Sequence, residues 1–199
     1  MNIILNKSTI RLAMAMLATF ALSYSISISD FNIYQIFCQF TYVSNIAVII
    51  VLFLVGTKQI DEKNILLVLP QIMVTYLVYS LVLSKGISTE TMFSIVEHYI
   101  VPIYFLMDFF CVVRERPSIF KVVFVILCFI VGYLSFMFSY GAVTGYYPYF
   151  FIDLSKYSLE KVSIATAMII TLVFVVLAVI VTIKELQIYI YKKILDRRA

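Results

Sequence analysis

The sequence predicts an all-α membrane protein with six transmembrane helices and with both termini in the cytoplasm. Two observations predict this class: long apolar blocks, and an uneven distribution of Lys and Arg between the loops. The 199-residue chain is 63% hydrophobic and 13% charged, and its mean hydropathy is +1.05. Soluble domains carry about 25% charged residues, which argues against a soluble core. Because no linker interrupts the blocks, residues 1–199 are expected to form a single transmembrane domain.

Six apolar segments are long enough to cross the hydrocarbon core of a bilayer, which takes ~20 residues of helix. Helices are expected because lipid offers no partner for an unpaired backbone group. Barrel strands need only ~10 residues of alternating polarity, a pattern that is absent here. The first segment is long for a secretory signal peptide and is interpreted as a span. The segments are Ile10–Ile28, Gln35–Val55, Ile65–Ser84, Thr91–Val113, Ile119–Tyr140 and Val162–Ile183.

The Lys and Arg residues indicate the orientation, because cytoplasmic loops carry the excess of these residues. With the N-terminus inside, twelve of the 15 lie inside, and Lys85, Lys156 and Lys161 lie outside. This asymmetry favours a multi-pass protein of the cell membrane. Residues 184–199 are expected to extend the last helix as a basic cytoplasmic tail on the anionic inner leaflet. The twelve are Lys7, Arg11, Lys58, Lys63, Arg114, Arg116, Lys121, Lys184, Lys192, Lys193, Arg197 and Arg198.

Several function classes find no support in the sequence. One histidine and scattered carboxylates give no metal site, and no Gly-rich phosphate loop indicates a cofactor. No basic stripe with interleaved aromatics indicates nucleic acid as a partner. The three cysteines are odd in number and have no ligand spacing, so they are interpreted as small apolar side chains. Membrane lipids remain the expected partners.

Polar residues inside two of the spans are candidates for function, because such groups are costly in lipid. The second span carries Thr41, Ser44 and Asn45 on one helix face. The fourth carries His98, the single histidine, and Asp108. At 1.5 Å per residue, Thr41 lies ~9 Å and His98 ~10 Å below the outer ends of their spans. The two side chains are therefore expected at matching depth in the outer leaflet.

A hydroxyl and an imidazole at the same depth suggest nucleophilic catalysis. A threonine hydroxyl is a weak nucleophile until a base removes its proton, and histidine is the usual base. Asn45 or backbone N–H groups are candidates to stabilise an oxyanion. The alternative is structural, because Thr, Ser and His commonly join membrane helices through hydrogen bonds.

Other residues are expected to support this site. Pro102 frees the carbonyl of His98 and should open the helix there. Asp108 lies ~15 Å further along the helix than His98 and should pair with a basic or polar group near the inner face. Asp153 is a candidate to orient His98, whereas Glu97 is expected to face the outer aqueous rim.

The loop between the last two spans is rich in aromatic residues. Tyr at headgroup level is typical of an interfacial anchor. The functional interpretation is a lid over a site beneath it. The aromatic residues are Tyr146, Tyr147, Tyr149, Phe150 and Phe151, around Pro148.

Three motifs resemble those of a bacterial family of six-helix membrane proteins (the Pr-six-Pr type), over roughly residues 31–183. The motifs are Phe40-Thr41-Tyr42-Val43-Ser44-Asn45, then His98-Tyr99-Ile100-Val101-Pro102 with Asp108, then Tyr147-Pro148-Tyr149-Phe150-Phe151-Ile152-Asp153. That family is distantly similar to the animal androgen-induced membrane proteins, which hydrolyse fatty acid esters of hydroxy fatty acids. The family's loop reads Tyr-Pro-Tyr-Pro-Phe-Leu-Asp, so Phe150 and Ile152 depart from it.

The resemblance implies an intramembrane lipid ester hydrolase in which Thr41 is the nucleophile and His98 the base. Its substrate would be a fatty acyl ester that reaches the site from the outer leaflet. Two alternatives stay open: a lipid-binding or structural membrane protein without chemistry, and a small transporter. A transporter needs a polar path through both leaflets, whereas the polar groups here cluster in the outer half.

Overall fold

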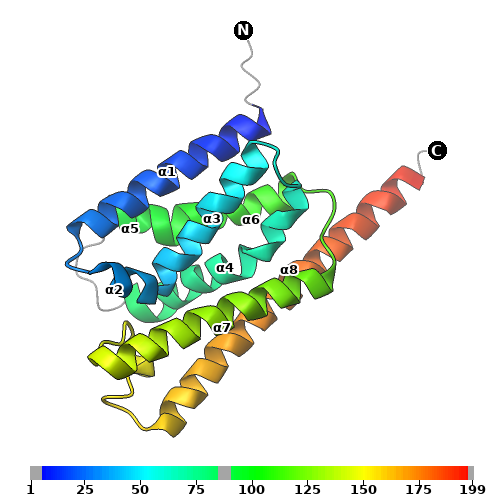
Figure 1. Cartoon of the computed structure of the whole chain (residues 1–199). Helices are drawn as coiled ribbons and strands as arrows, with labels where there is room; N and C mark the ends of the chain where they lie inside the picture. The colour runs from blue at the N-terminus through cyan, green and yellow to red at the C-terminus, as the bar shows by residue number, and fades with distance from the viewer. Residues whose placement is uncertain (1–5, 85–90, 197–199) are drawn as a thin grey trace.

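The computed structural model describes residues 6–84 and 91–196, and the described chain contains helices and loops without a strand (Figure 1). Four helical stretches are long and apolar enough to cross a membrane: Lys7–Ile28, Met92–Cys111, Ile119–Thr144 and Leu159–Ile194. The expected second and third spans are shorter apolar helices, Phe40–Gly56 and Leu69–Leu83. The fold is thus that of an all-helical membrane protein with four candidate spanning helices among the residues described.

The helical elements follow the predicted segments closely, with breaks inside three of them. Their bounds are α1 Lys7–Ile28, α2 Ile33–Cys38, α3 Phe40–Gly56, η1 Glu62–Leu67, α4 Leu69–Val78, η2 Tyr79–Leu83, α5 Met92–Ile95, η4 Val96–Ile100, α6 Val101–Cys111, α7 Ile119–Thr144, η5 Phe150–Ile152 and α8 Leu159–Asp196. Of these, η1 and η5 are 3₁₀-helices, and η2 and η4 are single π-helical turns.

The helices pack around one apolar core and leave apolar side chains on the outside. Helix α1 packs along α3, and α4 packs against α8 (Figure 1). Leu52 of α3, Ile72 of α4 and Phe105 of α6 are completely buried in this core. On the outer faces, Phe120 and Phe124 are 83% and 67% exposed. An apolar surface outside a packed core is what a lipid environment requires, because water would make such exposure unfavourable.

Charged side chains join several helices at one end of the bundle. Asp108 accepts hydrogen bonds from Arg11 Nε at 2.8 Å and from Arg11 Nη2 at 3.0 Å, and both residues are buried. Glu62 Oε2 accepts hydrogen bonds from Arg11 Nη1 at 3.2 Å and from Lys7 Nζ at 2.7 Å. The predicted pairing of Asp108 with a basic group is therefore confirmed, and it joins α1 to α6.

Buried Lys184 makes a second connection at this end, although the sequence suggested an exposed basic tail from that residue onward. Its Nζ donates to the carbonyls of Phe109 at 3.1 Å and Val113 at 2.5 Å, and to Gln187 Oε1 at 3.0 Å. The ammonium thus satisfies carbonyls at the C-terminal end of α6, where the helix dipole favours a cation. The tail is helical through Asp196, as part of α8.

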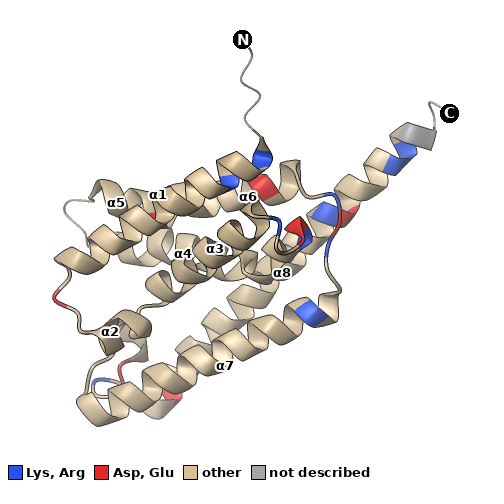
Figure 2. Ribbon diagram, turned by 45° about the horizontal axis from the view of Figure 1, so that its top comes forward, with Lys and Arg blue, Asp and Glu red and all other residues tan. Residues whose placement is uncertain are grey.

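Both described ends of the chain lie at this charged end of the bundle. Lys121 at the start of α7 donates to Asn64 at 3.0 Å. Arg116 pairs with Glu185 of α8. Figure 2 shows Lys and Arg gathered at the end where the chain begins and finishes. Lys85, Arg197 and Arg198, which the sequence-based orientation included, lie outside the described residues.

Candidate active site

Thr41 lies in the first turn of α3, directly after a break in the predicted second span. The break at Gln39 removes the helical partners of the Cys38 carbonyl and the Phe40 N–H. Tyr133 OH donates to the Cys38 carbonyl at 2.7 Å, and Tyr149 OH accepts from Phe40 N at 2.9 Å. Two tyrosine hydroxyls from elsewhere in the chain therefore satisfy a backbone opening that lipid would leave unpaired.

The loop between α7 and α8 packs over this break through two tyrosine side chains. Tyr146 OH accepts from Gln39 Nε2 at 2.8 Å. Tyr149 also interacts with both the side chain and the main chain of Thr41. Tyr147 instead packs against α7, where the absence of a side chain at Gly141 makes room for its ring. Tyr149, rather than Tyr147, is thus the loop residue that reaches the candidate nucleophile.

Ser44 and Asn45 position the backbone around Thr41. Ser44 Oγ donates to the Thr41 carbonyl at 3.0 Å and lies 2.8 Å from Thr75 Oγ1 of α4. Asn45 Nδ2 donates to the carbonyls of Thr41 at 2.9 Å and Glu97 at 3.4 Å. The interpretation of Asn45 as an oxyanion donor is not favoured, because its amide is directed at main-chain carbonyls. Both side chains link α3 to its neighbours.

His98 lies on the π-helical turn η4, which immediately precedes Pro102. Val101 N–H bonds to the carbonyl of Val96, five residues back. The predicted opening of the helix at His98 is therefore present, since Pro102 has no N–H to offer the His98 carbonyl. Such π turns are frequent at functional sites.

Two neighbours hold the ring of His98, which is 8% exposed. Tyr79 stacks on it with ring centroids 3.6 Å apart and an interplanar angle of 18°. His98 Nδ1 lies 2.9 Å from the Ser94 carbonyl. A carbonyl only accepts, so Nδ1 carries the proton in this contact and Nε2 is left with a lone pair. That tautomer is the one a general base requires.

Thr41 and His98 line one pocket of about 580 Å³ between α1, α3, η2 and η4. The pocket is also lined by Tyr42, Ser94 and Pro148. Within the described residues no hydrogen bond joins the Thr41 hydroxyl to His98. The two side chains therefore share one pocket without a direct hydrogen bond between them.

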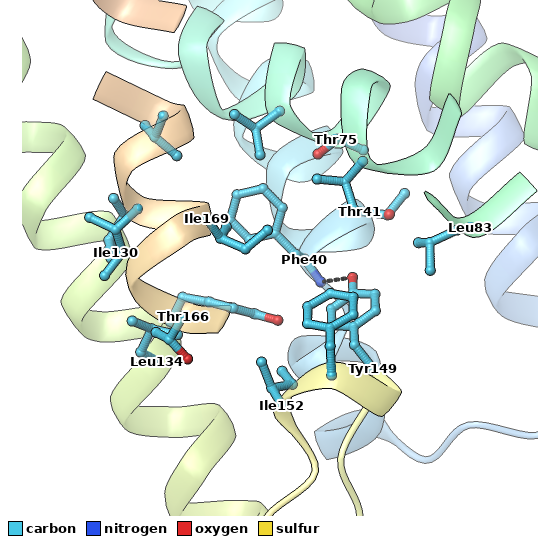
Figure 3. A pocket seen from close by; sticks show the side chains of 16 residues that line it. Phe40, Thr41, Thr75, Leu83, Ile130, Leu134, Tyr149, Ile152, Thr166 and Ile169 are labelled. Atoms are coloured by element: carbon cyan, nitrogen blue, oxygen red, sulfur yellow. Dashed lines mark hydrogen bonds between the residues drawn. The ribbon is translucent and has the colours of Figure 1, made fainter. Parts of the chain in front are cut away.

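An apolar cavity of about 70 Å³ adjoins this pocket at Thr41 (Figure 3). Phe40, Ile130 and Ile169 belong to its lining, which is almost wholly apolar. Thr41, Leu83 and Tyr149 line both spaces. The candidate nucleophile thus stands where an apolar cavity meets a pocket with polar side chains.

Glu97 and Asp153 differ from their predicted roles. Glu97 is 3% exposed and lines the pocket with His98, rather than facing an aqueous rim. Asp153 Oδ1 accepts from the backbone N–H of Ser155 at 2.9 Å, and Oδ2 pairs with Lys156 at 3.0 Å. Asp153 therefore holds a turn of the loop and does not orient His98. Hydrogen bonds from Ser155 and Lys156 keep the pKa of Asp153 below its ordinary value.

Sequence reasoning missed the residues that hold His98. Tyr79, on η2, and Ser94, on α5, carry no sequence motif. Helix spacing could have identified Ser94, which lies four residues before His98. Tyr79 could not be identified in this way, because it lies on η2 in the preceding predicted span. Among the described residues, no group of three or more His, Cys, Asp or Glu side chains is arranged to hold a metal ion.

Comparisons of the chain with protein-family models, curated proteins and solved structures gave no match.

Proposed function

We propose that this protein is a six-span protein of the cell membrane, with both termini cytoplasmic, that hydrolyses fatty acyl esters reaching it from the outer leaflet. The observation that carries the proposal is that Thr41 and His98, from different helices, line one pocket, and that Thr41 also lines the adjoining apolar cavity. An ester substrate needs this combination: an apolar space for its acyl chain and a polar space for its alcohol.

In the proposed reaction the Thr41 hydroxyl attacks the ester carbonyl carbon while His98 Nε2 takes the hydroxyl proton. The tetrahedral intermediate collapses, its bond to the alcohol oxygen breaks, and His98 returns the proton to the departing alcohol. Water then attacks the acyl-threonine with His98 again as base, which releases the fatty acid and restores Thr41.

The surroundings of Thr41 favour the negative charge that develops on the carbonyl oxygen. Tyr149 OH already accepts a hydrogen bond from Phe40 N–H, so its own proton is available to donate. Burial raises the pKa of Tyr149 to about 12, so the phenol keeps that proton at neutral pH. The N-terminus of α3 adds a partial positive charge at the same place. These groups replace the donor role first considered for Asn45.

The test is labelling by a lipid-like fluorophosphonate, which phosphonylates activated hydroxyls with release of fluoride, in membranes that contain the protein. We expect wild type to label and Thr41→Ala, which has no hydroxyl to react, not to label. His98→Ala should label at least about 100-fold more slowly, the usual scale for a lost base. Thr41→Ser keeps a hydroxyl and should still label. Thr171→Ala is the matched control, because the Thr171 hydroxyl bonds to the Ala167 carbonyl of its own helix.

Folded yield is measured for each variant by size-exclusion chromatography in detergent. Labelling of Thr41→Ala at the wild-type rate would overturn the proposed nucleophile. If well-folded wild type does not label, the result favours the second candidate function, which is a lipid-binding membrane protein without catalytic activity. That candidate has its own support, since the almost wholly apolar lining of the cavity suits hydrocarbon and the Thr41 hydroxyl forms no hydrogen bond with His98.

A further inference from the structure

Glu97 is a buried carboxylate that the proposed reaction does not use. Its side chain is 3% exposed and lines the pocket beside His98. The carboxylate interacts with the Ser25 side chain. Its Oε1 atom is buried and has no hydrogen-bond partner in the described part of the chain. A buried acceptor without a donor is unfavourable, so a donor on a bound molecule would be stabilising at this place.

The position of the apolar cavity determines which part of a substrate would meet Glu97. With the acyl chain in that cavity, the ester carbonyl lies at Thr41 and the alcohol extends into the pocket of His98. His98 must also reach the departing alcohol oxygen to return its proton. The alcohol, rather than the acyl chain, is therefore the part that lies beside Glu97.

The pocket around Glu97 is rich in hydroxyls. Ser25, Ser29, Tyr42 and Ser94 line it with Glu97, and neither Lys nor Arg is among the lining residues that the structure describes. An alcohol that carries a carboxylate would meet a buried acid without a compensating charge. A neutral alcohol with hydroxyl donors would meet acceptors instead.

We propose that Glu97 selects esters whose alcohol is uncharged and carries a further hydroxyl group, as a glycerol monoester does. This inference deepens the proposed hydrolase function and rests on it for the orientation of the substrate. Glu97 acts on the alcohol through a hydrogen bond from that further hydroxyl to Oε1. It is a specificity residue, and the bond-breaking steps remain with Thr41 and His98.

The experiment compares three decanoyl esters with the same acyl chain in detergent micelles: the glycerol monoester, the propyl ester, and the ester of 3-hydroxypropanoate. We expect wild type to prefer the glycerol ester to the propyl ester by about tenfold, the upper scale of one net hydrogen bond. Glu97→Met, which has no carboxyl group, should abolish this preference. Glu97→Gln, which replaces the acid with an amide of nearly the same shape, should raise the rate on the 3-hydroxypropanoate ester relative to the propyl ester.

Binding of the non-hydrolysable ether 1-O-decylglycerol separates this inference from the proposed function. We expect the ether to raise the thermal unfolding temperature of wild type more than that of Glu97→Met. Hydrolysis that depends on Thr41, with the same ester preference in wild type and both Glu97 variants, would overturn the inference and leave the hydrolase standing. Glu97-dependent binding of the ether without hydrolysis of any ester would support the selection of the alcohol and overturn the hydrolase.

Discussion

Tyr149 shows how one hydroxyl can serve both the fold and the chemistry. It accepts the hydrogen bond of Phe40 N–H at the helix break, and it lines both spaces that meet at Thr41. Tyr133 has a similar structural duty, because its hydroxyl donates to the Cys38 carbonyl across the same break. The pair therefore allows the structural and chemical roles to be separated.

Tyr149→Phe and Tyr133→Phe should each lower the free energy of unfolding by about 1–3 kcal/mol, because each leaves one buried backbone group unpaired. Only Tyr149→Phe should also slow fluorophosphonate labelling, by about 10-fold or more, through loss of an oxyanion donor. Thermal unfolding in detergent and labelling rates measure the two effects. Equal labelling rates in the two variants would contradict a chemical role for Tyr149.

Glu62 makes stability depend on pH at the charged end of the bundle. Burial alone would raise its pKa, but hydrogen bonds and charge from Lys7 and Arg11 outweigh burial, and the pKa lies below the ordinary value of 4.5. A carboxylate with a lowered folded-state pKa contributes stability above its unfolded pKa, and this contribution is lost as the pH falls through the folded value.

We therefore expect the unfolding temperature of wild type to fall between about pH 5 and pH 3, and Glu62→Gln to show a shallower decline in that range. At pH 7 the variant should be the less stable protein. Thermal unfolding at a series of pH values measures this. Asp61→Asn is the control, since Asp61 is an exposed neighbour whose ion pair with Lys63 has little weight. An unchanged slope in Glu62→Gln would contradict this account.

At the scale of the element, the apolar blocks located the helices but not the irregular turns inside them. Pro102 predicted the opening of the helix at His98, because a proline has no N–H to bond to the carbonyl four residues before it. The break at Gln39 carried no such signal, since it is held by tyrosines about one hundred positions away. The expectation for Glu97 was wrong because it assumed regular α-helical spacing, whereas Glu97 lies on a π turn.

The contact between α7 and the loop that follows it gives a prediction at this scale. A Cβ at Gly141 would lie 2.4 Å from Tyr147 Cε1, so Gly141→Ala must displace the ring. We expect a cost of about 1–3 kcal/mol, as for other overpacked sites. Tyr147→Ala added to Gly141→Ala should recover part of it, because the two residues are in contact. Additive losses of stability, measured by thermal unfolding, would contradict this packing.

At the scale of the whole molecule, the charge pattern was the most informative feature of the sequence. It predicted basic residues gathered at one side, and the bundle has a charged end where Lys7 pairs with Glu62 and Arg116 pairs with Glu185. Equal depth likewise predicted that Thr41 and His98 would lie together, and they share a pocket. The role of Asp153 was not predictable, because its carboxylate oxygens bond to Ser155 and Lys156 in a turn of its own loop.

The proposed orientation predicts which surface positions face the outside of the cell. The native Cys38, Cys111 and Cys128 are free, and they would first be replaced by Ala. A membrane-impermeant maleimide should then label Tyr157→Cys in intact cells, and Glu115→Cys only after permeabilisation. Labelling in the reverse order would invert the orientation and place the pocket in the cytoplasmic leaflet.

The most direct test of the central claim is to map the fluorophosphonate adduct by mass spectrometry of the labelled wild-type protein. The account predicts a phosphonylated peptide whose modified residue is Thr41, and no such adduct in His98→Ala at normal folded yield. An adduct on another hydroxyl of the same pocket, such as Ser25 or Ser94, would contradict Thr41 as the nucleophile.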